Sequence, residues 1–512
     1  MELRSRGCLT LMGMLTLWMA SPAGAHEPPR HCPPGFNDTP AMPVHFDQSD
    51  LVHFDQSDLL HGMSFTEIFQ AGQRIFTTDF NACDGAGRPG TNGTTSPRPV
   101  DPLEAPRFTR VSAPEATSCA GCHNEPEAGG AGDFVSNVFV TAQNLFPVSK
   151  ILLNDDFSQP FLERNTLGMF GSGAIELLGR EMTQNLAALK AQAIAAAKRQ
   201  NAPVTVQLVT KGVDFGALTA KPDGTLDTSA VQGIDPDLIV KPFSRKGAFR
   251  SVREFTVTAM NQHHGMQAVE RFGEGTDPDQ DGVVDELTIG DITAVSVFQE
   301  ALPVPIQDRH LARADQIQRG QTLFAQVGCT NCHVPALPLD STVFCDPDPA
   351  NPSSGPFMTF NDTSQSYCFD LRRRSGLRDN MVAAYTDLKR HVICDPNKPE
   401  FCNEPPSNLQ KTDSGYPCPY NEFLTAKLWD VGNSAPYGHR GDIDTIFAAI
   451  TAHGGEATAS EAQFQGLPDT DQAAIVAFLK TLKMPIIPGD LNTLENTGAE
   501  SFGHDEFHGQ GE

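Results

Sequence analysis

Long hydrophobic runs are almost absent from this sequence of 512 residues. The strongest candidate, Leu9–Ala20, is shorter than the roughly 18 apolar residues that identify a membrane-spanning helix. No later segment comes near that length. The mature chain is therefore predicted to have no membrane span.

Basic residues are also few. Lys and Arg number 37 against 63 Asp and Glu, which gives a formal net charge of −26 at pH 7. Such a chain is unsuited to the phosphates of nucleic acids or to an anionic membrane surface, so neither is predicted as a partner. The charge would suit a basic protein partner, or it serves solubility alone.

Tryptophan is scarce as well, with Trp18 and Trp429 as its two positions. Trp18 falls in the apolar run Leu9–Ala20, which follows two arginines and precedes the small-x-small sequence Ala23-Gly-Ala25. This order predicts a signal peptide over residues 1–25, cleaved near Ala25. A retained N-terminal anchor is the alternative. Export would place the mature chain in the periplasm or outside the cell, with Trp429 as its only tryptophan.

Two pentapeptides carry most of the chemical information: Cys119-Ala-Gly-Cys-His123 and Cys329-Thr-Asn-Cys-His333. Each offers two thiols that can add to the vinyl groups of a haem, followed by an imidazole that can bind the iron. Chance would supply roughly 0.01 such motifs in a chain of this composition. A zinc knuckle would need a second Cys or His pair nearby, and a thioredoxin-type pair needs no histidine. We therefore predict two covalently bound c-type haems. The predicted attachment and proximal residues are Cys119, Cys122, His123, Cys329, Cys332 and His333.

The remaining cysteines predict disulfides. Cys8 lies in the signal peptide, and seven others lie outside the haem motifs: Cys32, Cys83, Cys345, Cys368, Cys394, Cys402 and Cys418. Five of them fall in one Pro/Asn/Asp-rich stretch, which is typical of a loop held by disulfides in an oxidising compartment. Seven is odd, so one thiol is free or pairs between chains.

The segment before each haem motif is repeated. Ala71-Gly-Gln-Arg-Ile-Phe76 and Arg319-Gly-Gln-Thr-Leu-Phe324 both place Gly and Phe four residues apart, on one face of a short helix. We expect the glycine to allow close packing and the phenylalanine to cover the haem edge. The predicted division is a signal peptide (1–25), an N-terminal cytochrome c-like domain (26–310), a C-terminal one with the Cys-rich loop (311–487) and a flexible tail (488–512).

Between these segments, residue patterns predict an inserted module. Gly173–Asn201 has a long helical pattern, Val204–Val209 and Phe215–Ala220 alternate like strands, and Val252–Arg271 is helical again. The predicted fold class is mainly α: two cytochrome c-like helical domains with a small β insertion and long loops.

Two histidine groups are candidates for the distal side of the haems. His453 ends a helical segment before two glycines, and His263-His264-Gly-Met266 lies in another. Adjacent helical residues diverge by about 100°, so only one of the two neighbouring histidines can face a haem. We predict that His264 faces the first haem, as a displaceable ligand or an acid–base group. The alternative for each histidine is a hydrogen-bonded core residue.

Two further patterns involve carboxylates or histidines. In the first, alternating carboxylates before a glycine resemble a calcium loop, although the twelfth position is Thr288 rather than Glu. The predicted Ca²⁺ ligands are Asp277, Asp279, Asp281 and Glu286, with an acidic surface turn as the alternative. The second is an exact tandem duplication, Val44–Leu51 followed by Val52–Leu59, which we interpret as a local duplication at a permissive surface site, with a His/Asp metal site as the alternative.

These residues resemble a known family. The two haem motifs, Arg164-Asn-Thr-Leu-Gly-Met-Phe-Gly-Ser-Gly-Ala-Ile-Glu176 and Leu428-Trp-Asp-Val-Gly-Asn-Ser-Ala-Pro-Tyr-Gly-His-Arg-Gly441, look like those of the di-haem oxidoreductases. That group is related to the bacterial di-haem cytochrome c peroxidases and to the methylamine dehydrogenase maturation enzyme. The resemblance covers most of residues 65–485.

The resemblance implies roles for further residues. His453 stands where the peroxidases have Met and the maturation enzyme has Tyr, and paired histidine ligands would give the second haem a lower potential than His/Met ligands. The first haem becomes the candidate peroxide site, with Glu176 or Glu181 as a proton shuttle. Trp429 is expected to pack near the haems.

The function implied is an exported di-haem c-type oxidoreductase of the peroxidase type. It would take electrons from a small cytochrome or cupredoxin and pass them to peroxide. Two alternatives stay open: an electron-transfer cytochrome that turns over no substrate, and a maturation-type enzyme that oxidises a protein side chain.

Overall fold

The computed structural model describes residues 53–80, 84–86, 116–132, 135–138, 162–277, 283–348, 366–394 and 421–487. Its α-helices are α1 (Gln56–Gly62), α2 (Phe65–Thr77), α3 (Ser172–Gln200), α4 (Val252–Ala259), α5 (Val269–Phe272), α6 (Ile289–Glu300), α7 (Ala314–Gln326), α8 (Leu371–Arg374), α9 (Ile446–Thr451), α10 (Thr458–Gln465) and α11 (Asp469–Lys480). None of the helices in these ranges is long and apolar enough to cross a bilayer.

The strands are mostly short. They are β1 (Val135–Val138), β2 (Leu162–Asn165), β3 (Val204–Thr210), β4 (Val213–Ala220), β5 (Leu226–Asp227), β6 (Ile306–Gln307), β7 (Leu337–Pro338), β8 (Val343–Asp346), β9 (Tyr367–Asp370), β10 (Met381–Val382), β11 (Arg390–Val392), β12 (Glu422–Leu424) and β13 (Leu482–Lys483). Only β3, β4 and β5 form a three-stranded sheet among the described residues; the others pair two by two.

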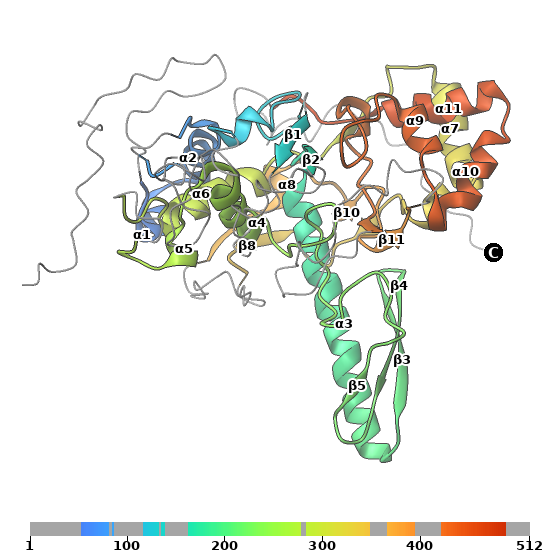
Figure 1. The fold of residues 1–512 in the computed structure, drawn as a ribbon, viewed down its shortest axis with the longest axis horizontal. Helices are drawn as coiled ribbons and strands as arrows, with labels where there is room; N and C mark the ends of the chain where they lie inside the picture. Colours follow the sequence, from blue (N-terminus) through green and yellow to red (C-terminus); the bar gives the residue numbers. More distant parts are fainter. Residues whose placement is uncertain are drawn as a thin grey trace, which may run out of the picture.

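Each haem motif is preceded by a helix that packs on a later helix through a glycine. A Cβ atom on Gly72 of α2 would overlap the carbonyl oxygen of Ala294 in α6. A Cβ atom on Gly320 of α7 would overlap the carbonyl oxygen of Ala474 in α11 in the same way. Close approach of the backbones therefore requires glycine at both places. The sequence repeat corresponds to a repeated helix pair, and the two pairs lie at opposite ends of the body (Figure 1).

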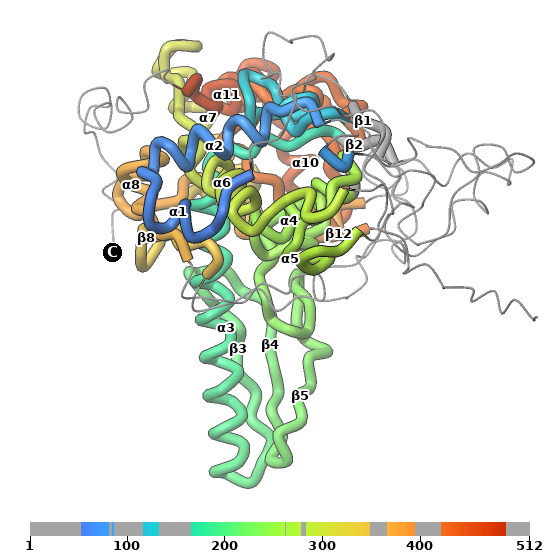
Figure 2. Tube along the Cα trace, turned by 90° about the vertical axis from the view of Figure 1, so that its left-hand side faces the viewer, coloured from blue at the N-terminus to red at the C-terminus, as the bar shows by residue number. Residues whose placement is uncertain are grey.

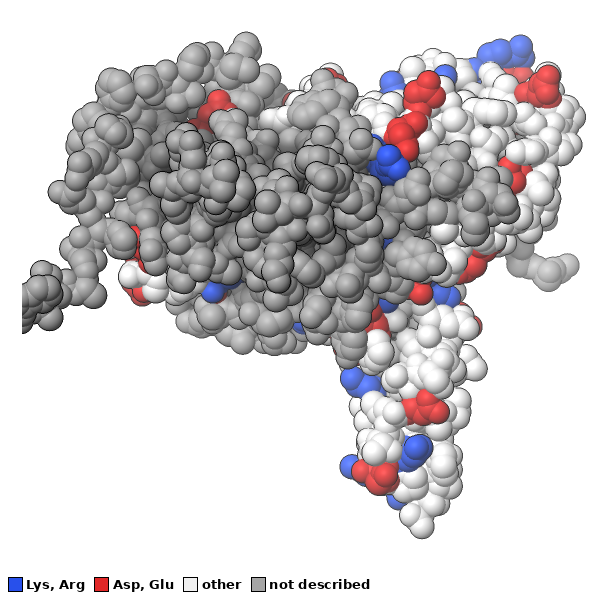
Figure 3. Space-filling view, viewed as in Figure 1, with Lys and Arg blue, Asp and Glu red and all other residues white. Residues whose placement is uncertain are grey.

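The predicted inserted module is confirmed as an arm that projects from the body. α3 begins after Gly171 and ends at Gln200, and its C-cap Asn201 has a left-handed backbone conformation that suits the end of a helix. β3, β4 and β5 run beside α3, and Figures 1 and 2 show helix and sheet leaving the body together. Ala193 and Ala197 pack on the sheet at Ala220. Small side chains let the helix lie close to the strands. Acidic and basic side chains are interspersed along the arm in Figure 3.

The predicted fold class, mainly α with two cytochrome c-like helical domains, is wrong. Helices make up 41% of the structure and strands 16%, in several small sheets. Outside the arm, strands such as β8 and β9 lie in the Cys-rich stretch that the sequence analysis assigned to a loop. Strands of two to four residues are too short to show an alternating pattern, and partners distant in sequence pair them. β11, for example, pairs with β12 about thirty residues later.

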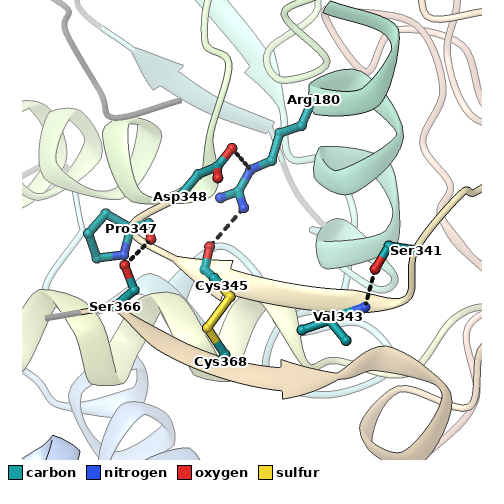
Figure 4. Close-up of a disulfide and its surroundings, with 8 residues drawn as sticks. All are labelled: Arg180, Ser341, Val343, Cys345, Pro347, Asp348, Ser366 and Cys368. Atoms are coloured by element: carbon teal, nitrogen blue, oxygen red, sulfur yellow. Dashed lines mark hydrogen bonds and ion pairs between the residues drawn. A yellow bond between two sulfur atoms is a disulfide. The ribbon is translucent and has the colours of Figure 1, made fainter. Parts of the chain in front are cut away.

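Disulfide bonds hold part of the predicted Cys-rich loop. Cys345 in β8 and Cys368 in β9 face each other across the antiparallel pair and are bonded (Figure 4). Arg180 of α3 donates to the carbonyl oxygen of Cys345 at 2.7 Å. Cys394 is disulfide-bonded too. The loop is therefore fixed to the base of the arm as well as to itself.

The hydrophobic cores do not follow the predicted domain boundary at residue 310. The largest core cluster runs from Leu59 to Met484 and includes Leu371 and Trp429. A second cluster holds α7 and α11 residues such as Phe324 and Phe478. The boundaries given above stay a prediction. The signal peptide, the tail, Val44–Leu51, Asp279 and Asp281, together with Cys32, Cys83, Cys402 and Cys418, lie outside the described residues.

The second copy of the tandem duplication lies partly at the surface, with His53, Asp55, Ser57 and Asp58 exposed, and is partly anchored to α6. Leu59 is fully buried, and the backbone N–H of Phe54 donates to Asp291 of α6 at 2.9 Å. The ring nitrogen Nδ1 of His53 lies 2.7 Å from the same carboxylate. The interpretation of this copy as a surface duplication is therefore incomplete, because its polar groups also complete the N-terminal cap of α6.

Candidate functional site

Both Cys-x-x-Cys-His segments fold into the same tight turn. In η1 (Cys119–Gly121), the backbone N–H of His123 donates to the carbonyl oxygen of the first cysteine at 2.9 Å. In η5 (Cys329–Asn331), the N–H of His333 makes the same bond at 3.0 Å. None of the four cysteines of the motifs is in a disulfide bond. Each turn presents two thiols and an imidazole from five consecutive residues, as a covalently attached haem requires.

Each proximal imidazole is oriented by a backbone carbonyl. Nδ1 of His123 lies 3.2 Å from the oxygen of Gly130, and Nδ1 of His333 lies 3.0 Å from the oxygen of Tyr385. A carbonyl only accepts, so Nδ1 carries the proton and Nε2 keeps its lone pair. Burial lowers the pKa of both histidines to about 4. Both side chains are therefore neutral at pH 7, which is the form that binds a metal ion.

Phenylalanines from the repeated helices lie beside the proximal histidines. The rings of Phe76 and His123 have centroids 6.1 Å apart, and those of Phe324 and His333 are 6.3 Å apart. A second phenylalanine backs each one, Phe298 of α6 at the first site and Phe478 of α11 at the second. The two sites are thus built on one plan, with an apolar wall that suits the face of a porphyrin.

The second site brings His453 to His333. Their ring centroids are 6.4 Å apart and the rings are inclined at 66°. Two imidazoles on one metal ion, each about 2.0–2.1 Å from it, have centroids separated by roughly 6 Å. Nδ1 of His453 lies 2.7 Å from the carbonyl oxygen of Ala449, so its Nε2 also keeps a lone pair. The residues present therefore fit one haem iron between them, and ligation by His453 stays a prediction.

The first site places His264 beside the attachment turn. His264 is the last residue of η4 (Met260–His264), a π-helical turn that ends at the left-handed Gly265. Its Nδ1 lies 2.8 Å from the carbonyl oxygen of Ala116, and its Nε2 lies 3.5 Å from the sulfur of Cys119. The side chain is buried, which lowers its pKa to about 4. His263 is more exposed than His264, and the role of His264 at the first haem stays a prediction.

Trp429 joins the two hydrophobic cores. It is 3% exposed and belongs to the larger cluster, whereas the preceding Leu428 packs against the second. A Cβ atom on Gly171, at the start of α3, would overlap its ring. The same segment carries Lys427, whose Nζ donates to the carbonyl oxygen of Gly168 at 2.6 Å. The family-like segment Leu428–Gly441 thus packs on the other family-like segment, Arg164–Glu176.

The predicted proton shuttles, Glu176 and Glu181, make the contacts of structural anchors. One oxygen of Glu176 accepts the backbone N–H of Val252 at 2.7 Å, at the start of α4, and the other faces Arg180. Glu181 accepts the N–H groups of Asp340 and Ser341. These bonds occupy the oxygens that a shuttle would use, and the shuttle role stays a prediction.

Of the predicted calcium ligands, Asp277 and Glu286 lie within the described residues. Glu286 is buried, and its Oε2 accepts the backbone N–H of Gln267 at 2.7 Å. It also lies against Gly85, where a Cβ atom would overlap its side chain. This carboxylate ties the segment after the loop to Gln267, just before α5. Calcium binding stays a prediction.

Sequence reasoning missed a histidine at the edge of the second site. His391 of β11 lies between the carboxylates of Asp387 and Glu456, with its Nε2 and Nδ1 each 2.8 Å from a carboxylate oxygen. The sulfur of Cys332, a carboxylate oxygen of Asp387 and a ring nitrogen of His391 lie within 4.8 Å of one another. Asp387 and His391 are four residues apart, but outside a helix that spacing gives no signal.

Sequence reasoning also missed a buried network of charges at the base of the arm. Arg253 donates to Asp346 at 2.6 Å and to Glu270, and all three side chains are buried. Glu300 is fully buried nearby, and neither of its oxygens has a hydrogen-bond partner among the described residues. Burial, and then the charges of Asp346 and Glu176, raise the pKa of Glu300 well above its usual value.

Comparison with known proteins agrees with the resemblance at the C-terminal segment. A family model described as "Di-haem oxidoreductase, putative peroxidase" matches residues 409–482, which include His439 and His453. The match supports assignment of the chain to the di-haem oxidoreductase family. Both Cys-x-x-Cys-His segments lie outside the matched residues.

Other comparisons add little. No curated protein matches the chain. A solved structure of hydrazine synthase from Kuenenia stuttgartiensis, pressurized with xenon, is similar with a TM-score of 0.34 and 14% identity. The alignment covers 94% of this chain and 100% of that one. A TM-score this low carries no argument about fold or function.

Proposed function

We propose that this chain is an exported di-haem c-type oxidoreductase that reduces peroxide. Electrons from a donor protein would enter at the second haem and reach peroxide at the first. The observation that carries the proposal is the difference between the two sites. At the second, His333 and His453 face each other at a separation that suits one iron. At the first, His264 approaches the attachment sulfur instead.

The haems, when bound, would supply one-electron redox chemistry and a coordination position for peroxide. Reduction of one hydrogen peroxide to two waters takes two electrons and two protons. His264 is placed to handle a proton at Nε2, because its Nδ1–H is held by the carbonyl of Ala116. Its low pKa, caused by burial, keeps it neutral and able to accept a proton from peroxide.

The proposed partners and location follow from charge and from the N-terminal pattern. A net charge of −26 favours a basic donor, of the small cytochrome or cupredoxin type. Covalent haem attachment takes place outside the cytoplasm, which agrees with a signal peptide cleaved near Ala25. We therefore place the working protein in the periplasm or outside the cell.

The test is carbon monoxide binding to the reduced protein, followed by peroxide turnover with a small reduced donor. We expect carbon monoxide to bind one haem and peroxide to be consumed. Binding at neither haem, without turnover, would identify an electron carrier. Carbon monoxide binding without peroxide turnover would favour an enzyme that oxidises another substrate, such as a protein side chain.

His453→Ala provides the matched control for this experiment. Removal of the imidazole that faces His333 should open the second haem, so that carbon monoxide binds two haems in place of one. The potential of that haem should rise, because one of two imidazole donors is lost. An unchanged low-spin spectrum of the second haem would show that His453 is not its ligand.

A further inference from the structure

The contacts of His391 make it a cation held between two acids. It lies in β11, opposite Phe423 of β12, and its side chain is buried. Carboxylates only accept, so the nitrogens that face Asp387 and Glu456 both carry protons. Burial by itself would lower the pKa of His391, but the hydrogen bonds to Asp387, Cys332 and Glu456 outweigh it and raise that pKa to about 11.

The two acids belong to the segments that place the iron-facing histidines. Asp387 follows Tyr385 by two residues, and the carbonyl of Tyr385 orients His333. Glu456 follows His453 by three residues. Its second oxygen accepts the backbone N–H of Val392 at 2.8 Å, so both of its oxygens hold β11. His391 therefore connects the segments on both sides of the second site.

The imidazole also reaches the attachment edge of that site, because Cys332 lies within the same 4.8 Å group. Cys332 precedes His333 and is the predicted second thioether position. A charge at this distance from a haem acts on its two oxidation states differently, since the reduced haem carries one positive charge less.

We propose that His391 is a positioning residue of the second haem site, which holds the His333 and His453 segments together and sets the haem potential with a fixed positive charge. The inference rests on the part of the proposed function that places a haem at Cys329 and Cys332. It does not depend on peroxide as the substrate.

The test is a pair of variants with opposite expected effects on the potential of the second haem. In His391→Asn, the amide nitrogen stands near the position of Nδ1 and keeps the bond to Glu456, while the positive charge is lost. The potential of the second haem should fall. In Glu456→Gln, a negative charge is lost at a half-exposed position, and the potential should rise. Both are measured by spectroscopic redox titration of the holoprotein, with the low-spin signal of each haem recorded.

His53→Gln is the control, because it removes another histidine–carboxylate contact, at the N-terminal cap of α6. It should leave the potential of the second haem unchanged. Unchanged potential of that haem in both test variants would overturn the proposal, as would shifts in the same direction or an equal shift in the control. If the His391→Asn variant fails to accumulate, the sign of the potential shift of the second haem in Glu456→Gln alone decides the test.

The outcome is separable from that of the proposed function. Normal peroxide turnover with no shift in potential would overturn the role of His391 and leave the peroxidase proposal intact. Shifts of opposite sign in a protein that consumes no peroxide would support the role of His391 and remove the peroxidase proposal.

Discussion

Backbone carbonyls decide the chemistry of the histidines at both sites. His123, His333 and His453 each direct Nδ1 at a main-chain oxygen, of Gly130, Tyr385 and Ala449. The hydrogen bond fixes the tautomer and the ring orientation without adding a charge. Each Nε2 is thereby prepared for a metal ion before the haem arrives.

His264 is held by a carbonyl in the same way, but it lies beside Cys119. We expect an acid–base role, so His264→Ala should slow peroxide turnover by about 10²–10⁴-fold and leave the spin state of the first haem unchanged. Stopped-flow kinetics and the absorption spectrum measure the two effects. The adjacent and more exposed His263 gives the control variant, His263→Ala, which should turn over normally. Conversion of the first haem to high spin in His264→Ala would identify a ligand instead.

Trp429 lies where the two hydrophobic cores meet, and its fluorescence can be measured. Its buried ring packs at the start of α3, so haems held at the two attachment turns should quench its fluorescence almost completely in the holoprotein. As the only tryptophan expected after cleavage near Ala25, it makes the emission spectrum specific. Strong emission from a protein that carries both haems would place the ring far from them.

The two attachment motifs could be recognised from the sequence, because thiol and imidazole spacing is fixed by the haem itself. His453 was named through the family resemblance, and its ligation stays a prediction. His391 could not be recognised from the sequence. Its two carboxylate partners lie at positions 387 and 456, and only the folded chain brings the second one near. Contacts between distant segments leave no local pattern. The burial of Glu300 could not be predicted for the same reason.

At the scale of helices, the Gly–Phe repeat was informative because it encodes a packing requirement. α2 and α7 approach α6 and α11 so closely that a methyl group would meet a backbone oxygen. The predicted fold class was wrong because the elements it missed carry no such local signal. The two-stranded sheets depend on partners far along the chain and on a disulfide, and neither is visible in residue periodicity.

Alanine at either glycine should therefore loosen one helix pair and disturb one haem. Gly72→Ala and Gly320→Ala each force extra volume against a backbone oxygen, at a cost of about 1–3 kcal/mol in the free energy of unfolding. The first should alter the spectrum of the first haem and the second that of the second haem, because Phe76 and Phe324 pack beside different histidines.

Denaturant unfolding and visible spectra would measure these effects. Gly62→Ala, at the exposed end of α1 where a Cβ atom meets nothing within 4 Å, is the control and should not destabilise the protein or alter either haem spectrum. Equal disturbance of both haems by one substitution would contradict the repeated-pair interpretation.

At the scale of the whole molecule, negative charge is in excess inside as well as outside. The buried network at the base of the arm contains Arg180 and Arg253 with Glu176, Glu270 and Asp346, and Glu300 lies in the same region without a hydrogen-bond partner in the described structure. Two guanidinium groups cannot neutralise four carboxylates. Part of this region must therefore hold protons, and the stability of the fold should depend on pH.

The pKa shifts give the sign of that dependence. Burial raises the pKa of Glu176 to about 7 and that of Glu300 well above its usual value. Between pH 4.5, the ordinary value of a glutamate, and about 7, the folded protein keeps protons that the unfolded chain releases. The stabilisation that these bound protons give is therefore fully present below the ordinary glutamate pKa. It is lost as the pH rises through the raised pKa values of the folded protein.

Glu300→Gln should remove much of this loss, since an amide of the same shape needs no proton. We expect the variant to exceed the parent protein by about 1–3 kcal/mol in the free energy of unfolding at pH 8, and to match it near pH 4.5. Denaturant titrations at the two pH values measure the difference. Glu270→Gln is the matched control at a carboxylate that is paired with Arg253. It should destabilise at pH 8, because it breaks a buried ion pair. A Glu300→Gln variant less stable than the parent at pH 8 would mean that this carboxylate is ionised and bound in the native protein, and the proton-holding interpretation of the network would fail with it.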